Sequence, residues 1–355
     1  DFQVDGSNTN FVAERFNGES TVVTFNGGGS QTVSGDVLDE PFSTVRIEAS
    51  SDVTFSSGTG MGDLFVDGGS SATFETTSSV RAEGEGNVTV TNGTLTTGRF
   101  GMDGNLSIGA DGTHNHDSNV LFINGGFSND GSFVAGSGTT VQFQPGSELT
   151  SNVSTSTSIS VEKLKVDGAG TVNLQNDLTL NSNLTVIEGS ITSSGGILNF
   201  AGGTDQSISV PDGASLPKIK ITGASTTGKF DDNNTSFTVD GLDVGANSTF
   251  DLVDSNNTTL FVTSAVSVDG TLQLSSGDLD LKVGEGEAGA DFMVNGTLNA
   301  RGDKVTLNGS DAQSIEGPAN GAGLTFFDLE IDNSNGVSIS GGTAGVEQDL
   351  ILTAG

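Results

Sequence analysis

The stretch VSVDGTLQLSSGDLDLKV, residues 266–283, decides the fold of this chain. Its apolar residues occupy every second position within short runs, and each run stops at an Asp-Gly or Ser-Gly pair. Alternation with a period of two is typical of a β-strand with one buried face, and such glycine pairs mark turns. The stretch therefore predicts very short strands joined by tight turns. The same pattern occurs at 178–191 and 88–95, and no segment carries an apolar stripe of helical period over three turns.

A five-residue cassette repeats at the turns. It reads VDGTL at 268–272 and VNGTL at 294–298, a step of 26 residues between the first valines, which suits one coil of a solenoid. Because Asp-Gly and Asn-Gly tolerate a positive φ, we interpret these pairs as tight corners. We expect the apolar side chains around them to point inward and to be nearly inaccessible to solvent, namely Val268, Leu272, Leu274, Leu281 and Val294.

A longer repeat combines a strand, a glycine-containing turn, a glutamine and an apolar residue. Its three copies are VTFNGGGSQTVSG at 23–35, LNFAGGTDQSISV at 198–210 and VTLNGSDAQSIEG at 305–317. A fourth copy, starting near 141, has lost the glutamine. No linker separates the blocks that start near 23, 141, 198 and 305, so we predict one continuous solenoid over residues 1–355.

The composition agrees with a thin core. Only 33% of the residues are hydrophobic and 53 of 355 are glycine, yet 21 phenylalanines argue against disorder. A parallel β-helix accommodates this composition, because only about one face of each short strand is buried. We therefore predict an all-β chain folded as a parallel β-helix. The alternative is a string of two or three β-sandwiches, which would require longer strands and longer connections.

Charge and missing residue types exclude several functions. The net charge is −33, whereas binding to nucleic acid or an anionic membrane needs clustered Lys and Arg. No apolar run is long enough to span a bilayer. The chain has no Cys, Tyr or Trp and only two His, so most residue types used in catalysis and cofactor binding are absent or scarce. We expect no enzymatic activity, no cofactor, no nucleic-acid partner and no membrane insertion.

Calcium is the one ion that the acidic turns favour, because Ca²⁺ prefers carboxylate and carbonyl oxygens. The candidate ligands are Asp231, Asp232, Glu285, Glu287 and Asp291. The alternative is diffuse condensation of cations on an acidic surface.

Three further patterns each have a functional and a scaffold interpretation. His114 and His116 lie two apart and could hold a metal on one strand face, or belong to a polar loop. Asp278 and Asp280 also lie two apart and so share a strand face. They could form a pair of carboxylates for glycoside hydrolysis, or they could belong to a row of solvated acids on the outer face. The tripeptide at 301–303, Arg-Gly-Asp, is expected by chance in a chain rich in Gly and Asp.

The C-terminal copy carries a resemblance. NGSDAQSIEG at 308–317, followed by LTFFDLEIDNSNGVSISGGTAGVEQDLILTAG at 324–355, resembles a repeat of secreted surface proteins of Bacteroidota. The matching residues are Gln313, Ile315, Gly317, Phe326, Leu329, Ile331, Asn333, Gly336, Val337, Leu352 and Gly355. The repeat occurs in adhesins and gliding-associated proteins, many of them exported by the type IX route with a C-terminal sorting domain that is not visible here. The resemblance implies a β-solenoid scaffold and transfers no catalytic residues.

Together these features predict a non-enzymatic extracellular structural rod, secreted or at the cell surface, as an adhesin stalk or a filament-forming subunit. The alternative is a carbohydrate-active or glycan-binding parallel β-helix, which the absence of Trp and Tyr disfavours unless an exposed Phe replaces them. Phe326 and Phe327 should point to opposite faces if one strand carries both. Because terminal coils expose unpaired strand edges, we expect end-to-end self-association, or continuation in a longer chain, to bury Ile351 and Leu352.

Overall fold

A computed structural model shows the chain as two compact units, Asp1–Asn176 and Asp177–Gly355. It describes residues 2–4, 9–12, 22–34, 37–56, 59–74, 80–82, 86–147, 149–156, 159–230, 236–252, 258–275, 279–284, 290–321 and 323–354. All regular structure in these residues is β-strand. None of their segments forms a helix long and apolar enough to cross a membrane.

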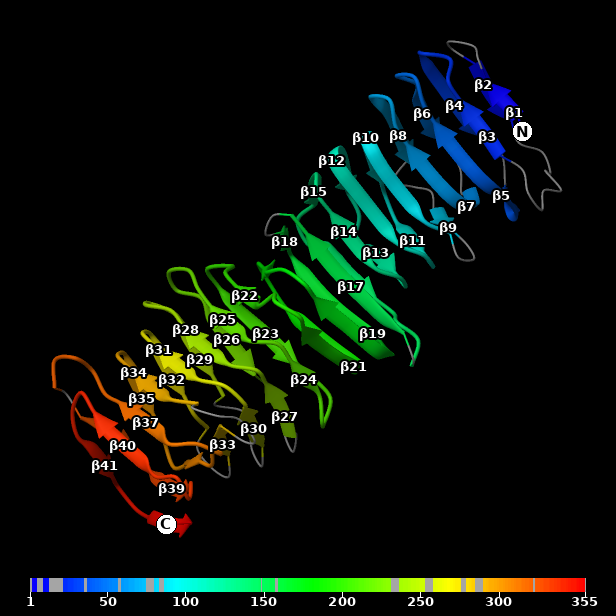
Figure 1. The fold of residues 1–355 in the computed structure, drawn as a ribbon. Coiled ribbons are helices and arrows are strands. Elements are labelled where there is room, and N and C mark those ends of the chain that lie inside the picture. The colour runs from blue at the N-terminus through cyan, green and yellow to red at the C-terminus, as the bar shows by residue number, and fades with distance from the viewer. Residues whose placement is uncertain are drawn as a thin grey trace. The chain divides into compact units, whose positions relative to one another are not determined.

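The second unit winds through three strands in each coil, and strands of successive coils pair in parallel (Figure 1). The first ladder contains β20 (Leu178–Leu180), β22 (Leu198–Phe200), β25 (Ile219–Ile221), β28 (Leu242–Val244), β31 (Val266–Val268), β34 (Phe292–Val294), β37 (Gln313–Glu316) and β40 (Val337–Ser340). The second contains β21 (Leu184–Ser193), β23 (Asp205–Ser209), β26 (Thr227–Phe230), β29 (Thr249–Asp251), β32 (Thr271–Gln273) and β35 (Thr297–Asn299). The third contains β24 (Ser215–Leu216), β27 (Ser236–Val239), β30 (Thr259–Val262), β33 (Asp280–Val283), β36 (Lys304–Leu307), β39 (Asp328–Asp332) and β42 (Leu350–Ala354). A separate pair is formed by β38 (Leu324–Phe326) and β41 (Ala344–Val346).

The first unit is built in the same way, although several of its strands run around a corner and serve two ladders. One ladder contains β1 (Phe2–Val4), β3 (Val22–Phe25), β5 (Val37–Ile47), β7 (Thr59–Val66), β10 (Val88–Thr97), β12 (Leu106–His116), β14 (Phe127–Asn129) and β17 (Thr150–Thr155). A second contains β2 (Thr9–Val12), β4 (Ser30–Ser34), β6 (Asp52–Phe55), β8 (Ser70–Phe74), the ends of β10 and β12, and β15 (Ser132–Ala135). A third contains the start of β7, then β9 (Val80–Ala82), β11 (Phe100–Met102), β13 (Val120–Ile123), β16 (Thr140–Phe143) and β19 (Lys163–Leu174). The remaining strand of this unit that the structure describes is β18 (Ile159–Val161), which belongs to none of these three ladders.

These parallel ladders confirm the predicted parallel β-helix, and the β-sandwich alternative is wrong because sandwiches pair their strands antiparallel. A coil takes 20 residues where Leu178 pairs with Leu198, and 26 where Val266 pairs with Phe292. The prediction of one continuous solenoid over 1–355 concerns the junction between the two units and stays a prediction.

The core of each unit consists of columns of apolar side chains, one from each coil. The cassette residues Val268, Leu272, Leu274, Leu281 and Val294 are all 0% exposed, which confirms their predicted inward orientation. One column of paired residues contains Phe237, Leu260, Leu281, Val305 and Leu329. Each apolar side chain stacks on an apolar side chain of the next coil and is thereby removed from water. Because each strand needs only one apolar face for this, a chain of low hydrophobicity can still fold.

The cassette glycines have a different role from the one predicted. Gly270 and Gly296 are not among the residues with positive φ. Instead, a Cβ atom added to Gly270 would overlap the carbonyl oxygen of Ser248, and one added to Gly296 would overlap that of Gly270. The corner therefore needs glycine because the backbone of the preceding coil passes too close for any side chain.

The repeated glutamines form internal corner ties. Gln206 and Gln313 are buried at the start of a strand, and each Nε2 donates to two backbone carbonyls of the preceding coil at 2.7–3.0 Å. Each Oε1 accepts the backbone N–H of a glycine four residues earlier, Gly202 at 3.2 Å and Gly309 at 2.8 Å. In these two copies of the repeat, the glutamine amide thus satisfies backbone groups that a corner removes from the ladder.

Candidate functional site

The second ladder of the second unit is interrupted between β35 and β38. Both strands are fully described, yet β38 pairs only with β41 and no ladder hydrogen bond connects it to β35. The preceding segment, 317–323, contains Pro318, which cannot donate a backbone hydrogen bond, and Gly321, whose φ is +76°. The backbone edges that face each other across this break are therefore not used by the solenoid.

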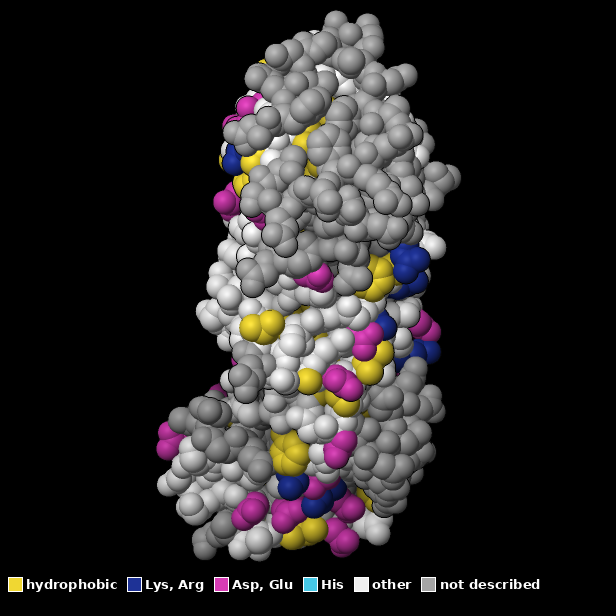
Figure 2. Space-filling model, turned by 90° about the vertical axis from the view of Figure 1, so that its right-hand side faces the viewer, with side chains coloured by type: hydrophobic (Ala, Val, Ile, Leu, Met, Phe, Trp, Pro, Cys, Tyr) yellow, Lys and Arg dark blue, Asp and Glu magenta, His cyan; other side chains and the backbone are white. Residues whose placement is uncertain are grey.

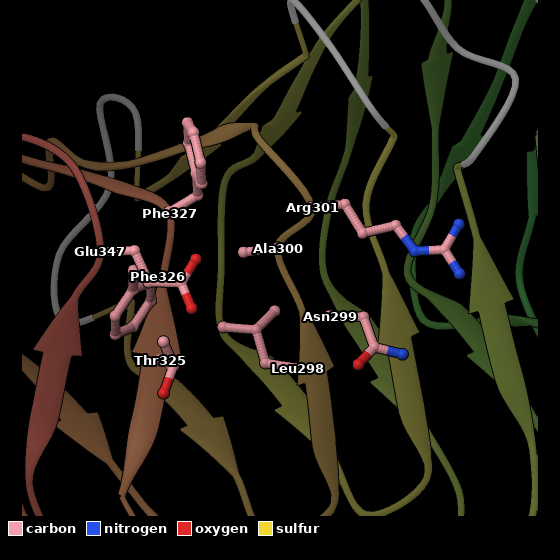
Figure 3. A pocket seen from close by; sticks show the side chains of 8 residues that line it. All are labelled: Leu298, Asn299, Ala300, Arg301, Thr325, Phe326, Phe327 and Glu347. Carbon is pink, nitrogen blue, oxygen red and sulfur yellow. The ribbon is translucent and has the colours of Figure 1, made fainter.

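A pocket of about 310 Å³ opens at this break (Figure 3). It is lined by Leu298, Asn299, Ala300, Arg301, Thr325, Phe326, Phe327 and Glu347. Phe326 is buried against Phe292, with ring centroids 5.8 Å apart, whereas the half-buried Phe327 points the opposite way. The two rings point in opposite directions although β38 ends at Phe326 and no single strand carries both residues, and Phe327 gives the pocket an aromatic wall.

Polar groups surround the apolar part of this pocket. The carboxylate of Glu347 points toward Leu298 and Ala300, and the guanidinium of Arg301 points away from them (Figure 3). The backbone N–H of Glu347 donates to the carbonyl of Phe326 at 2.9 Å, which fixes the acid beside the pocket. The pocket thus has one acceptor-only side chain that points inward and one cationic side chain, Arg301, whose charged end is turned away.

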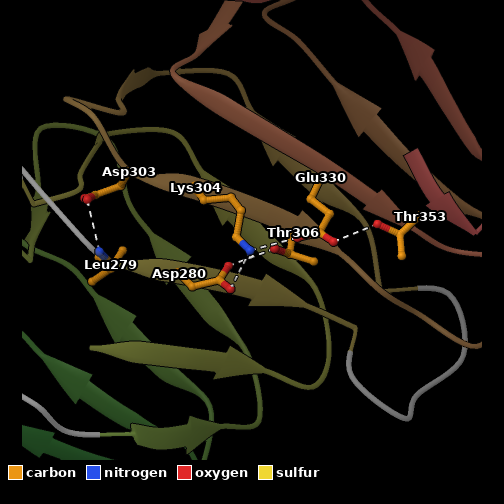
Figure 4. Close-up of polar contacts among 7 residues, drawn as sticks. All are labelled: Leu279, Asp280, Asp303, Lys304, Thr306, Glu330 and Thr353. Atoms are coloured by element: carbon orange, nitrogen blue, oxygen red, sulfur yellow. Dashed lines mark hydrogen bonds and ion pairs between the residues drawn. The ribbon is translucent and has the colours of Figure 1, made fainter. Parts of the chain in front are cut away.

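The Arg-Gly-Asp tripeptide is a corner of the scaffold. Asp303 is 1% exposed, and its Oδ1 accepts a hydrogen bond from Ser275 Oγ at 3.0 Å. The same atom accepts a second hydrogen bond from the backbone N–H of Leu279 at 3.1 Å (Figure 4). Arg301 and Gly302 form the turn with φ values of +50° and +119°. Since the aspartate is buried, it is not available to a partner, in agreement with a chance occurrence of the motif.

Asp280 belongs to a tie across three coils (Figure 4). Lys304 Nζ lies 3.1 Å from Asp280 Oδ2 and 2.8 Å from Glu330 Oε2. The hydroxyls of Thr306 and Thr353 each donate to one of these carboxylates at 2.8 Å. Asp278, its suggested partner in hydrolysis, lies outside the described residues.

The protonation behaviour of this tie does not suit acid catalysis. Burial lowers the pKa of Lys304, but its hydrogen bonds to Glu330 and Asp280 outweigh that effect, and the pKa lies above its usual value. The hydrogen bonds from Lys304 and Thr353 lower the pKa of Glu330. A general acid needs a raised pKa, so the lowered pKa of Glu330 identifies this side chain as a fixed ion-pair partner of the lysine.

Other lysines also lie beside acids. Lys165 Nζ is 2.8 Å from Asp167 Oδ2, and Lys229 Nζ is 2.7 Å from Asp205 Oδ2. Figure 2 shows acidic and basic side chains interspersed on the face that it draws. The few basic groups thus reduce local repulsion in a strongly acidic chain.

Of the five calcium candidates, only Asp291 lies in the described residues. Its Oδ1 accepts the backbone N–H of Ser314 on the next coil at 2.8 Å, which is a scaffold contact. Asp231, Asp232, Glu285 and Glu287 lie outside the described residues, so the calcium prediction stays a prediction. Within the described part of the chain, no three His, Cys, Asp or Glu side chains gather in a way that could hold a metal ion.

The polar-loop interpretation of the histidines is wrong, because His114 and His116 lie in β12 and are fully buried. The hydroxyl of Thr97 lies between them, 2.9 Å from His114 Nε2 and 2.8 Å from His116 Nδ1. Among the described residues, Nδ1 of His114 has no hydrogen-bond partner. Burial lowers the pKa of His114 to about 3 and that of His116 to about 4, so both rings are neutral near pH 7.

A second, larger pocket in the first unit has a polar lining that the scaffold already uses. It measures about 590 Å³ and lies over Asn87, Asn105 and Asn124, among others. Asn105 Nδ2 donates to Asn87 Oδ1 at 3.0 Å, and Asn124 Nδ2 donates to Asp103 Oδ1 at 2.6 Å. These amides tie neighbouring coils together, so much of their hydrogen-bonding capacity is already used.

The last described coil presents apolar side chains to solvent. Ile339, Leu350 and Leu352 pair with Ile315, Leu329 and Ile331 of the preceding coil and so continue its inward-facing columns. They are nevertheless 54%, 58% and 70% exposed. Ile351, which is 40% exposed, pairs with Glu330 and faces the other way. Leu352 therefore occupies a core position, and Ile351 lies on the outer face.

Sequence reasoning missed most of the pocket. Asn299, Thr325 and Glu347 come from three successive coils and share no local motif. The adjacent Phe326 and Phe327 were the only usable signal, because alternation in a strand must expose one of them.

A scan of protein-family models, a search of curated proteins and a search of solved structures each found no match.

Proposed function

We propose that this chain is a non-enzymatic structural protein of the cell surface, as a filament subunit or an adhesin stalk, in which either a further copy or further coils of a longer chain cover the last described coil; of these two, we favour end-to-end joining of copies. The observation that carries the proposal is the exposed apolar surface of the last described coil, formed by Ile339, Leu350 and Leu352. These side chains continue core columns, so another coil laid on β40 and β42 would bury them as it would inside the solenoid. The cell-surface location rests on the resemblance to surface-protein repeats.

A second copy suits this surface because parallel ladders repeat by translation. In the described residues, β40 and β42 pair on one edge only, and so do β1 and β2. An edge that ends one ladder is complementary to an edge that begins another, and such head-to-tail contacts generate open filaments. The net charge of −33 opposes lateral contacts and so favours assembly through the ends.

The expected strength of this contact is moderate. Burying one large aliphatic side chain contributes about 1.5–3 kcal/mol, so three that are already partly buried contribute on the order of 4 kcal/mol. Association costs about 4–15 kcal/mol in lost freedom, so the ladder hydrogen bonds must supply the remainder. Assembly should therefore depend strongly on protein concentration.

Sedimentation velocity over a range of protein concentrations tests the proposal. We expect the mass of the wild-type chain to rise with concentration and the Leu352→Glu variant to remain a monomer. The matched control is Ile187→Glu, since Ile187 is 47% exposed on β21, away from the last coil. A wild-type monomer at every concentration, or equal assembly of Leu352→Glu, would contradict the proposal.

A further inference from the structure

We propose that the pocket between β35 and β38 binds one residue of a neutral saccharide. This inference is independent of end-to-end assembly, because it rests on the interior of the pocket and not on the last coil. The ligand class follows from the size of the gap, the hydrogen-bonding groups that the scaffold leaves unused, and the charge around them.

The gap is too narrow for a peptide strand. Some Cα atoms of β35 and β38 lie within 8 Å of each other. A strand inserted between them would need about 9.6 Å, twice the usual spacing of about 4.8 Å. The pocket volume of about 310 Å³ lies at the lower end of the range for ligand pockets, which suits a small ring compound.

The polar side chains of this pocket are free to bind. Asn299, Thr325 and Glu347 have no side-chain hydrogen-bond partner in the described part of the chain, in contrast to the amides of the larger pocket. An amide and a hydroxyl both donate and accept, and a carboxylate accepts. Sugar hydroxyls also donate and accept, so they match this mixture of groups.

The half-buried ring of Phe327 supplies the apolar surface that a sugar needs. One face of a pyranose consists of C–H groups, which can lie against an aromatic ring while the hydroxyls at its edge reach polar groups. In this pocket the ring of Phe327 and the carboxylate of Glu347 belong to adjacent coils, so a single ligand can touch both.

The charge around the pocket selects a neutral ligand. The nearest carboxylate, on Glu347, points into the pocket, and Arg301 is turned away from it. An acidic sugar would therefore meet a negative group inside a chain of net charge −33. A metal ion would find a single carboxylate, which is too few ligands for calcium.

Saturation-transfer NMR on the full-length protein tests this inference, with methyl glycosides of glucose, galactose, mannose and N-acetylglucosamine as probes and methyl galacturonoside as the acidic probe. We expect at least one neutral glycoside to give a ring-proton signal, and the acidic probe to give none. Phe327→Ala should weaken binding at least tenfold, as should Asn299→Ala, which leaves the aromatic wall in place.

The matched control is Phe261→Ala, because Phe261 is also a half-buried phenylalanine of this unit but lies on β30, away from the pocket. It should bind like the wild type, and so should the Leu352→Glu variant, which separates this test from the test of assembly. Absence of binding by every neutral probe, equal binding by Phe327→Ala, or preference for the acidic probe would overturn the inference.

Discussion

Replacing Gln313 with methionine should destabilise the coils around it far more than an equivalent change at the surface. The amide makes four hydrogen bonds: Nε2 donates to the carbonyls of Val283 at 3.0 Å and Ala290 at 2.7 Å, and Oε1 accepts from Gly309 N and Asn333 Nδ2, both at 2.8 Å. Methionine has a similar shape and makes none of these bonds, so the change isolates hydrogen bonding from packing.

The expected loss can be estimated from the groups left behind. The carbonyl of Val283 keeps a bond from Asn308 N, and Asn333 Nδ2 keeps its bond to the carbonyl of Asp311. The carbonyl of Ala290 and the N–H of Gly309 lose the glutamine as a partner. At about 1–3 kcal/mol for each unsatisfied buried group, the local free energy of unfolding should fall by about 4 kcal/mol.

Hydrogen exchange measured by mass spectrometry suits this test, because a solenoid can open locally and the chain has no Trp or Tyr for fluorescence. A loss of about 4 kcal/mol should accelerate exchange about a thousandfold in peptides covering 305–317, since each 1.4 kcal/mol is a factor of ten. The control is Gln273→Met, since Gln273 makes one bond, to Asp251 Oδ1 at 3.2 Å, on the outer side of β32. Equal effects of the two substitutions would refute the corner-tie explanation of the glutamine repeat.

Three further predictions concern the scaffold. The pKa values of about 3 and about 4 for His114 and His116 lie below the unfolded value, so their contribution to stability is complete above pH 6.5 and declines as the pH falls toward 4. Because of these two histidines, the free energy of unfolding should be about 4 kcal/mol lower at pH 5 than at pH 7. Urea denaturation at several pH values measures this dependence, which should be about half as steep in the His114→Leu variant. An unchanged slope in that variant would contradict the prediction. Gly270→Ala should lower the melting temperature because its Cβ overlaps the preceding coil, whereas Gly241→Ala, where the nearest atoms are 3.4 Å or more away, should be tolerated; equal melting temperatures would argue against the close approach. Lys304→Met should lower stability by about 1 kcal/mol at low salt and less at high salt, because both ion pairs are partly exposed, and a loss independent of salt would exclude this electrostatic origin.

The fold was predictable from the sequence because each coil of a solenoid consists of short strands and turns, whose pattern is visible within a few residues. The alternation around Val268 and Leu281 determines which side chains point inward, whatever the exact length of each coil. The role of the cassette glycines was not predictable, because the carbonyl that excludes a side chain at Gly270 belongs to Ser248 on another coil. A sequence pattern reports the turn but not the backbone that passes next to it.

The candidate site was predictable only in part, and for the same physical reason. The pocket depends on a missing ladder between β35 and β38, and nothing in either strand differs in pattern from its neighbours. Burial of His114 and His116 was also missed, because two polar residues in an alternating run look like an outer face or a loop. Their inward orientation follows from the register of β12 with β10, which places Leu95 beside His114 and Thr97 beside His116.

Cryo-electron microscopy of the concentrated wild-type protein tests the central proposal most directly. If copies join end to end, the images will show filaments in which a strand of the next copy lies about 4.8 Å from β42, with Leu352 buried between the two coils. Separate particles in which Leu352 faces solvent, or filaments joined through their sides, would contradict the proposal.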